Sequence, residues 1–152
     1  VAIDQSTTAI DIEKQGLNIE VAHLLSPRAA DFVYEDYTQY KKIDAFYSRF
    51  TIHSITKSDE EELLSNVYSA LKDGGLFCIE VRTTKDTLCG VGQDCGDNTF
   101  MTDGHRRRFI DSVEFRNRVV GMGFKELYFI EKDNLSVYKN DNPVLMRIIL
   151  KK

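Results

Sequence analysis

Two pairs of polar residues in the first part of the chain stand directly after short apolar stretches. Asp4 and Gln5 follow one stretch, and Asp36 and Tyr37 follow another. A carboxylate at the end of a strand can accept hydrogen bonds from both hydroxyls of a ribose. Asp36 could accept from the exocyclic amine of an adenine while the ring of Tyr37 lies against the base. The two pairs therefore predict a nucleoside site, with a plain strand-end acid at Asp4 and a solvated loop at Asp36 as the alternatives.

Two later apolar stretches also end in polar residues. Ser48, Arg49 and Phe50 end one of them, with His53 close behind, and Arg82 ends the next. Ligands of open α/β sheets bind beyond the carboxyl ends of the strands, so these side chains should gather at one edge. We assign Ser48 to the nucleoside ligand and the other residues to a pocket for a second substrate.

A basic run from His105 to Arg108 follows a glycine-rich segment. Guanidinium groups bind phosphate or carboxylate in a bidentate fork, so Arg106 and Arg107 predict an anion site in a chain of net charge −4. His105 could take a proton from an attacking hydroxyl, because histidine titrates nearest to neutrality. The alternatives are a solvated arginine run paired with acids and a purely structural histidine.

These residues need strands and helices to hold them in place. Continuous apolar runs predict strands, and apolar residues spaced by three and four predict helices. Ser6 should cap the first helix, Ser58 and Glu61 should form a capping box for the second, and Asp111 should cap the third. The expected strands cover residues 1–4, 32–36, 43–47, 76–81, 124–131 and 144–150, and the expected helices cover 7–15, 58–73 and 111–122.

The order of these elements predicts the fold class. Strands that alternate with helices form a mainly parallel sheet between helical layers, which is a Rossmann-like three-layer α/β sandwich. The link at 133–142 is too short for a crossover helix, so a final antiparallel strand should close the sheet. Residues 83–104 have little periodicity and several glycines, which predicts a mobile loop that closes over the substrate. Residues 17–31 are ambiguous because Pro27 interrupts a continuous helix.

The composition limits the class of protein. The 152 residues suffice for a single domain, and the net charge of −4 argues against a general nucleic-acid binder. No apolar run reaches the roughly 18 residues that span a bilayer, and no signal peptide is visible at Val1. We expect a cytoplasmic protein with a small-molecule substrate and no membrane partner. Cys78, Cys89 and Cys95 are expected to be reduced thiols rather than a disulfide or metal pair.

Five segments of the chain form an ordered series. They are Val-Ala-Ile-Asp-Gln-Ser at 1–6, Phe-Val-Tyr-Glu-Asp-Tyr at 32–37, Ile-Asp-Ala-Phe-Tyr-Ser-Arg-Phe at 43–50, Leu-Lys-Asp-Gly-Gly-Leu-Phe at 71–77 and Gly-Met-Gly-Phe at 121–124. The series resembles class I S-adenosylmethionine-dependent methyltransferases over nearly the whole chain. In that family the segments correspond to the second strand with its acidic loop, the adenine-contacting segment, the fourth strand, and the turns before the fifth and sixth strands. The resemblance implies S-adenosylmethionine as the cofactor.

One part of that family's pattern has no counterpart in the sequence. The first strand of the family and its Gly-x-Gly-x-Gly loop, which holds the methionine end of the cofactor, are absent. We therefore expect residues 1–152 to form a single methyltransferase-like domain that is incomplete at its amino-terminal end. Its sheet should have a gap between the strands at 1–4 and 43–47, and the fragment should bind cofactor poorly.

The expected activity is methyl transfer to a small anionic acceptor, such as a phosphorylated or nucleotide-linked sugar. Transfer from a sulfonium needs positioning and proton removal rather than a metal ion or a covalent nucleophile, so no metal site is expected. Two alternatives remain open. A nucleotide-dependent oxidoreductase or epimerase could use Asp4 for a dinucleotide ribose, although the closing antiparallel pair disfavours it. A non-catalytic methyltransferase-like scaffold would need no glycine-rich loop.

Overall fold

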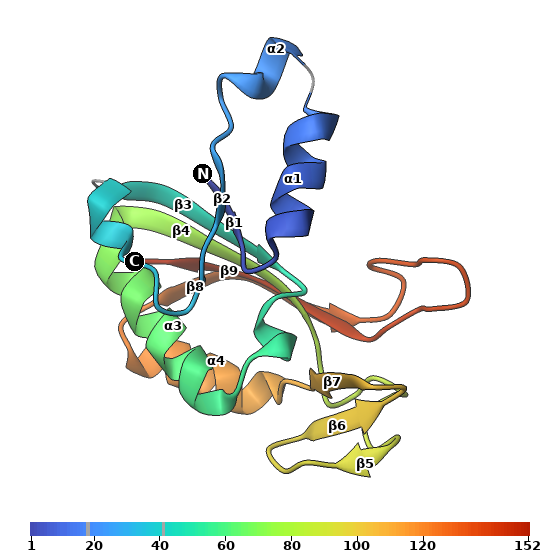
Figure 1. The fold of residues 1–152 in the computed structure, drawn as a ribbon. Coiled ribbons are helices and arrows are strands. Elements are labelled where there is room, and N and C mark those ends of the chain that lie inside the picture. The colour runs from blue at the N-terminus through green and yellow to red at the C-terminus, as the bar shows by residue number, and fades with distance from the viewer. Residues whose placement is uncertain (18, 41) are drawn as a thin grey trace. The chain divides into compact units, whose positions relative to one another are not determined.

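The structure is a computed structural model, and it describes residues 1–17, 19–40 and 42–152 of the chain. Their contacts divide the chain into two compact units, Val1–Asp36 and Tyr37–Lys152. Figure 1 shows the elements of both units. The predicted gap between the strands at 1–4 and 43–47 concerns the placement of one unit against the other, and it stays a prediction.

The first unit is built on a pair of parallel strands. Its elements are β1 (Ala2–Asp4), α1 (Thr7–Gly16), α2 (Ile19–Ala22) and β2 (Pro27–Ala29), and β1 pairs in parallel with β2. The predicted strand at 1–4 and helix at 7–15 are confirmed. The hydroxyl of Ser6 accepts a hydrogen bond from the backbone N–H of Ala9 at 3.2 Å, so Ser6 is the helix cap, as predicted.

The strand predicted at residues 32–36 is wrong. The side chain of Asp31 accepts a hydrogen bond from the backbone N–H of Val33 at 2.9 Å, which turns the chain instead of extending it. The strand that pairs with β1 is β2, which begins at Pro27. Proline at the first residue of a strand removes a backbone donor where the ladder can tolerate the loss.

The second unit contains most of the helices and strands. Its elements are η1 (Tyr37–Tyr40), β3 (Ile43–Arg49), η2 (Ile52–Ser54), α3 (Lys57–Ala70), β4 (Leu71–Arg82), β5 (Gln93–Asp94), β6 (Thr99–Thr102), β7 (His105–Arg108), α4 (Ser112–Gly121), β8 (Lys125–Lys132) and β9 (Leu145–Lys151). These bounds confirm the predicted strands at 43–47, 76–81, 124–131 and 144–150 and the two predicted helices. In the described part of the chain, no helix combines the length and apolarity needed to cross a bilayer.

The main sheet of this unit has the strand order β3-β4-β9-β8. Strands β3 and β4 are parallel, whereas β9 runs antiparallel to both β4 and β8. The predicted antiparallel pairing of the last two strands is confirmed, and β9 inserts between β4 and β8. The sheet is mixed rather than mainly parallel, because two of the three pairings in this four-stranded sheet involve the antiparallel strand.

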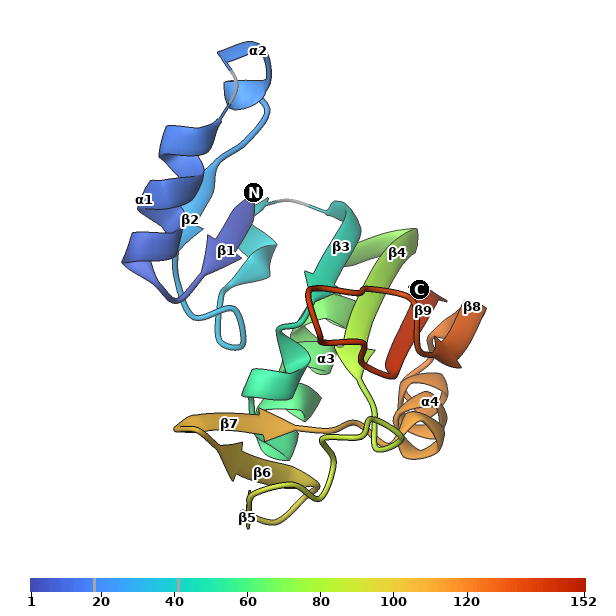
Figure 2. The same cartoon turned by 90° about the vertical axis from the view of Figure 1, so that its right-hand side faces the viewer.

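Helices α3 and α4 cover one face of this sheet, as Figures 1 and 2 show. Phe77, Ile79 and Val81 lie at alternate positions of β4 and are at most 2% exposed. The ring of Phe77 lies 6.4 Å from that of Phe124, which packs edge-on against Tyr68 of α3 at 4.8 Å. Each such fully buried apolar side chain contributes about 1.5–3 kcal/mol to the free energy of folding. This face is the hydrophobic core of the unit.

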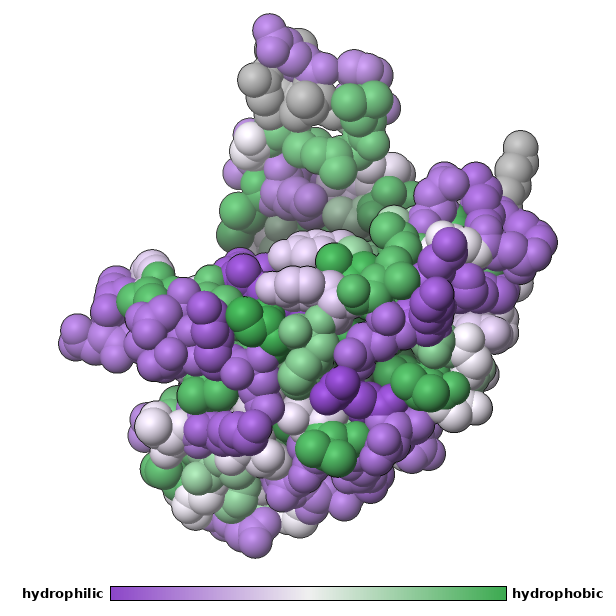
Figure 3. All heavy atoms as spheres, turned by 180° about the vertical axis from the view of Figure 1, so that it is seen from behind, coloured by the Kyte–Doolittle hydropathy of each residue, from purple (hydrophilic) through white to green (hydrophobic). Residues whose placement is uncertain are grey.

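The opposite face of the sheet carries a row of half-exposed side chains. Tyr47, Cys78, Ile149 and Tyr128 are cross-strand neighbours from β3 to β8. Tyr47 is 72% exposed and Tyr128 is 46% exposed. From the side seen in Figure 3, apolar side chains form separate patches divided by polar groups.

Helix α3 begins one residue earlier than predicted and has a different cap. Thr56 accepts from the backbone N–H of Asp59 at 3.1 Å, and Asp59 accepts from the backbone N–H of Thr56 at 3.2 Å. This reciprocal pair is the capping box, so the predicted box of Ser58 and Glu61 is wrong. The helix also ends at Ala70 rather than at residue 73, because Leu71 already pairs with β3.

Residues 83–104 were expected to form an irregular lid, but residues 93–94 and 99–102 of this segment form the strands β5 and β6. Strands β5, β6 and β7 form a three-stranded antiparallel sheet. Asp103 and Gly104, with φ angles of 51° and 75°, make the two-residue turn between β6 and β7. Both left-handed residues suit a hairpin turn of this length. The mobility predicted for residues 88–98 stays a prediction.

A buried carboxylate connects this small sheet to the two helices. Glu60 of α3 is 1% exposed, and its two oxygens form ion pairs with Arg108 of β7 and Arg118 of α4. Arg108 also donates to the backbone carbonyls of Ile55 at 3.0 Å and Ile52 at 3.4 Å. The ion pairs therefore join α3, β7 and α4, and the hydrogen bonds of Arg108 join β7 to η2 and to the residue after it.

Replacing Glu60 with alanine should destabilise the protein by about 3–5 kcal/mol, because Arg108 would be left buried without a carboxylate. Glu62 lies on the exposed side of the same helix, and Glu62→Ala should change the stability by at most about 0.5 kcal/mol. Urea denaturation of both variants measures the difference. Similar losses for the two variants would contradict the structural role of Glu60.

Candidate functional site

Asp4 and Gln5 lie at the carboxyl end of β1, and both are exposed. One carboxylate oxygen of Asp4, Oδ1, accepts from the backbone N–H of Ser6 at 2.7 Å. The other oxygen and the amide of Gln5 have no hydrogen-bond partner among the described residues. Asp4 therefore offers an oriented carboxylate whose second oxygen could accept from a ligand hydroxyl, which is the chemistry expected for a ribose.

Asp36 and Tyr37, predicted to contact an adenine, differ in exposure. Asp36 is exposed at the end of the first unit, while Tyr37 is 6% exposed within the second. The ring of Tyr37 packs edge-on against Phe46 of β3, with the centroids 4.9 Å apart. The contact of Tyr37 with an adenine stays a prediction.

The carboxyl end of β3 is held by a cross-strand ion-pair network. Arg49 donates to Glu80 of β4 at 2.8 Å and to the hydroxyl of Ser136 at 2.8 Å. The other oxygen of Glu80 accepts from Arg147 of β9. Arg49, Glu80 and Arg147 are direct neighbours in the sheet. Arg49 was predicted to bind substrate, but its guanidinium is already committed to this network.

Ser48, predicted as a cofactor ligand, lies on the other face of β3 from Arg49. Its hydroxyl forms a short hydrogen bond with the hydroxyl of Thr51, the residue before η2. Because each hydroxyl has both a donor and lone pairs, this bond leaves Ser48 capacity for another partner. Here the local role of Ser48 is to join the end of β3 to the start of η2.

Phe50 turns the chain from β3 into η2. Its φ of 55° is in the left-handed region, which is uncommon for a bulky residue. Its backbone N–H donates to the carbonyl of Glu80 at 2.9 Å. The guanidinium of Arg49 lies over its ring at 4.9 Å, and the imidazole of His53 lies 5.9 Å away. Such backbone outliers cluster at functional sites because the surrounding structure must hold them.

His53 is the most perturbed titratable group of the site. Burial lowers its pKa from 6.5 to about 4, and the positive charges of Arg107, Arg82 and Arg108 act in the same direction. Its Nδ1 atom is buried and has no hydrogen-bond partner within the described chain. The imidazole is therefore neutral near pH 7, with a nitrogen that the protein leaves unsatisfied.

Two of the three arginines around His53 are neutralised by carboxylates. Arg82, which is 6% exposed, pairs with Asp86 at 3.0 Å and also with Asp141. Arg108 pairs with Glu60. The guanidinium of Arg82 thus pairs with two carboxylates, and its role as a substrate ligand stays a prediction.

The remaining basic residues of β7 have different surroundings. Along a strand, neighbouring side chains point to opposite faces. His105 and Arg106 are exposed, whereas Arg107 is half-buried beside η2. None of the three has an ion pair or hydrogen bond through its side chain to any residue that the structure describes. The predicted anion site is thus divided, with Arg107 less exposed than His105 and Arg106.

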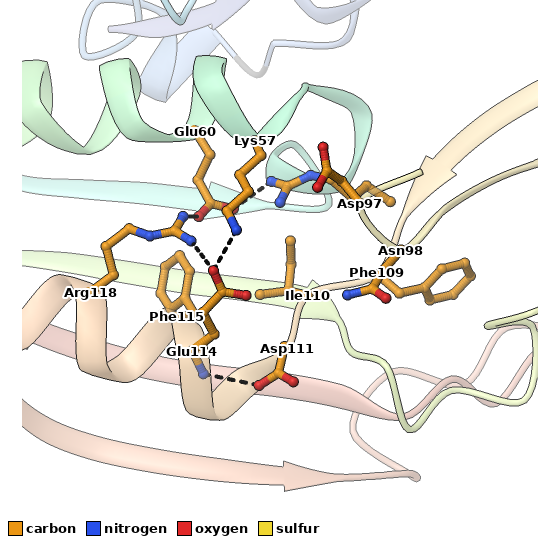
Figure 4. Close-up of a pocket in the computed structure, with 11 residues that line it drawn as sticks. Lys57, Glu60, Asp97, Asn98, Phe109, Ile110, Asp111, Glu114, Phe115 and Arg118 are labelled. Atoms are coloured by element: carbon orange, nitrogen blue, oxygen red, sulfur yellow. Dashed lines mark hydrogen bonds and ion pairs between the residues drawn. The ribbon is translucent and has the colours of Figure 1, made fainter. Parts of the chain in front are cut away.

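A small polar cavity of about 60 Å³ is lined by the starts of α3 and α4, the end of β7 and the loop residues Asp97 and Asn98. Figure 4 shows the chain of ion pairs in its wall, in which Lys57 pairs with Glu114 at 2.6 Å and Arg118 joins Glu114 to Glu60. The charged groups satisfy one another. A cavity of this size has room for a few water molecules but not for a nucleoside.

The ion pairs around Glu60 and Glu80 were not predicted from the sequence. A signal for one of them exists, since Glu80 and Arg147 each interrupt an otherwise apolar strand. A charge in a buried strand needs a partner of opposite sign. For Glu60 and Asp141 no local signal distinguishes them from neighbouring surface acids. All three cysteines are free thiols, as expected.

Comparisons with known proteins identify the fold. No protein-family model and no curated protein sequence matches the chain. A methyltransferase dependent on S-adenosylmethionine from Methanosarcina mazei aligns with 99% of this chain and 80% of its own, with 14% identity and a TM-score of 0.77. Another from Anabaena variabilis aligns with 98% of this chain and 66% of its own, with 18% identity and a TM-score of 0.71.

The glycopeptide N-methyltransferase MtfA is a third similar structure. It aligns with 98% of this chain and 76% of its own, with 13% identity and a TM-score of 0.72. MtfA has been solved with S-adenosylhomocysteine, S-adenosylmethionine and sinefungin bound. The chain therefore has the Rossmann-like α/β fold of methyltransferases that use S-adenosylmethionine, which confirms the resemblance at the level of the fold.

His53 should make the protein less stable in mild acid. Its folded pKa of about 4 lies below the unfolded value of 6.5, so between these values the unfolded chain binds a proton that the folded chain does not. The stability due to the neutral imidazole is complete above about pH 6.5 and falls by up to about 1.4 kcal/mol per pH unit towards pH 4. Urea denaturation between about pH 7 and 5 should therefore show a steeper loss for the wild type than for His53→Gln. If the stability of both proteins falls with pH to the same extent, the lowered pKa of His53 is contradicted.

Proposed function

We propose that the protein is a methyltransferase that uses S-adenosylmethionine. The observation that carries the proposal is the strand order β3-β4-β9-β8, with the antiparallel β9 inserted next to a parallel pair. The fold as a whole is similar to that of a methyltransferase solved with the cofactor or its analogues bound. A dinucleotide-dependent oxidoreductase or a non-catalytic scaffold has no comparable support.

The residues at the end of β1 fit one part of that cofactor. Asp4 has an oriented carboxylate with an open oxygen, and Gln5 adds an exposed amide beside it. We assign both to the ribose, and we keep Asp36, Tyr37 and Ser48 as further cofactor ligands. When bound, the cofactor supplies an activated methyl group on a sulfonium. The contribution of Asp4 is to fix the orientation of the ribose through charge-assisted hydrogen bonds.

The acceptor proposed for the reaction is a small molecule with an anionic group, such as a phosphorylated or nucleotide-linked sugar. Arg106 and Arg107 support this assignment, because neither side chain has a counter-ion in the described part of the chain. Phe50 and His53 line the same edge of the second unit. Arg49 and Arg82 contribute by holding that edge in place.

Methyl transfer also requires removal of a proton from the acceptor. As the bond from the methyl carbon to the acceptor forms and its bond to sulfur breaks, the sulfonium charge disappears and one proton must leave the acceptor atom. We propose His105 for this role, as the sequence predicts, and its side chain is exposed beside the turn between β6 and β7. The pKa of about 4 makes His53 a weak base, so we assign its neutral imidazole, with the unsatisfied Nδ1 atom, to ligand binding rather than to proton transfer.

The cofactor assignment is tested by calorimetric titration of the intact protein with S-adenosylhomocysteine. Saturable binding is expected, and Asp4→Ala should weaken it by about 1.5–3 kcal/mol, the usual range for lost hydrogen bonds to a charged group. Asp4→Asn keeps an oxygen that can accept from the backbone N–H of Ser6 but removes the negative charge. Weaker binding in this variant would therefore come from the lost charge and not from a disturbed turn after β1. Asp11→Ala, on the exposed surface of α1, serves as the matched control.

Three outcomes distinguish the functions. Unchanged affinity in Asp4→Ala would remove Asp4 from the site. Binding of NAD in place of S-adenosylhomocysteine would favour the oxidoreductase. Binding of neither ligand by the intact protein would favour a non-catalytic scaffold.

A further inference from the structure

Two polar groups without hydrogen-bond partners among the described residues lie on η2 and β7, which pack against each other. The first is the buried Nδ1 atom of His53, which has no hydrogen-bond partner in the described chain. The second is the guanidinium of Arg107, which is half-buried and lacks a carboxylate partner among the same residues. The charge of Arg107 acts directly on His53, ahead of the charges of Arg82 and Arg108.

The contrast with the neighbouring arginines shows what is missing at Arg107. Every other arginine near His53 has a carboxylate, with Asp86 and Asp141 beside Arg82 and Glu60 beside Arg108. Partly buried charges are normally paired, because removal from water is costly without a compensating partner. No carboxylate of the described chain fills that place for Arg107. The guanidinium charge of Arg107 is therefore available to pair with an anion from outside the chain.

We propose that Arg107 and His53 form one binding seat for an oxyanion, and that this seat holds the phosphate, sulfate or carboxylate group of the acceptor. The guanidinium would donate to the anion, and His53 would stand beside it. As a role in catalysis the inference rests on the proposed function, but the binding of an oxyanion at this place does not. The proposal assigns anion binding to Arg107 alone among the arginines at 106–108.

The seat is held in place from both sides. Arg108 donates to the carbonyls of Ile52 and Ile55, so the strand that carries Arg107 is tied to the segment that carries His53. On the other side, the left-handed turn at Phe50 brings its ring against the imidazole. A site whose supporting contacts exist before binding loses less entropy when the ligand arrives.

Binding of an anion should be coupled to protonation of His53. The groups that face the imidazole are Arg107 and Arg108 from β7 and Arg82 from β4, with Asp86, Asp141 and Glu60 compensating the last two. A bound anion would offset the positive charge of Arg107 and so favour the imidazolium. By linkage, the protonated imidazole favours the anion to the same extent. Anion affinity should therefore rise as the pH falls.

The test uses inorganic sulfate, whose charge is constant from about pH 5 to 8, at fixed ionic strength maintained with chloride. Sulfate is titrated into the intact protein and followed by the NMR signals of the histidine rings. The His53 resonance should shift and saturate, and the affinity at about pH 5 should exceed that at pH 8 severalfold. Arg107→Ala should weaken binding at least about tenfold. Arg106→Ala, the neighbouring residue on the opposite face of β7, should change it less than about twofold.

Two further measurements keep the result decisive. His53→Gln should retain sulfate binding but lose most of its pH dependence, and Arg107→Gln repeats the test if the alanine variant does not fold. Equal effects of Arg106→Ala and Arg107→Ala would mean general surface attraction and overturn the seat, as would binding that leaves the His53 signal unchanged. S-adenosylhomocysteine titrated into the same samples separates the two hypotheses. If S-adenosylhomocysteine does not bind, the proposed methyltransferase function is contradicted. If S-adenosylhomocysteine binds but sulfate does not, only the oxyanion site at Arg107 and His53 is contradicted.

Discussion

The carboxylate of Glu60 holds two guanidinium groups at a place where none of the three charges meets much water. It lies in the first turn of α3, where the positive end of the helix dipole favours a negative charge. One of its partners, Arg108, also donates a hydrogen bond to the backbone of η2. The other partner, Arg118, belongs to α4. The position of His53 relative to β7 thus depends on an acid that is itself remote from the ligand edge.

A second constraint lies in the sheet and has the same physical character. Glu80 accepts from Arg49 on one neighbouring strand and Arg147 on the other, and these arginines donate onward to Ser136 and to the carbonyl of Leu135. Arg82 holds the same connection through Asp141. The connection between β8 and β9 is therefore fastened to the carboxyl ends of β3 and β4. Charged residues at this edge serve mainly to hold backbone segments together, and only a few remain available for ligands.

The sequence predicts those parts of the fold that have local signals. Apolar runs locate β3, β4, β8 and β9, Ser6 and Asp111 locate helix starts, and a short link predicts the antiparallel pair. The strand at 32–36 fails because an Asx turn at Asp31 overrides an apolar and aromatic pattern. Strands β5 to β7 are too short to show a period. For the candidate site, the sequence finds His53 and Arg107 but not their surroundings, because pairings such as Glu60 with Arg108 join residues far apart along the chain.

The two-residue turn at Asp103 and Gly104 decides which face of β7 carries Arg107. The pairing of Thr102 with His105 across this turn sets the register of all of β7. Since side chains alternate along a strand, a slip of one residue would exchange the faces of Arg106 and Arg107. Insertion or loss of a single residue in the turn could therefore change the ligand preference of related chains without altering any residue of the site. Among homologues, the length of this hairpin should vary less than its composition.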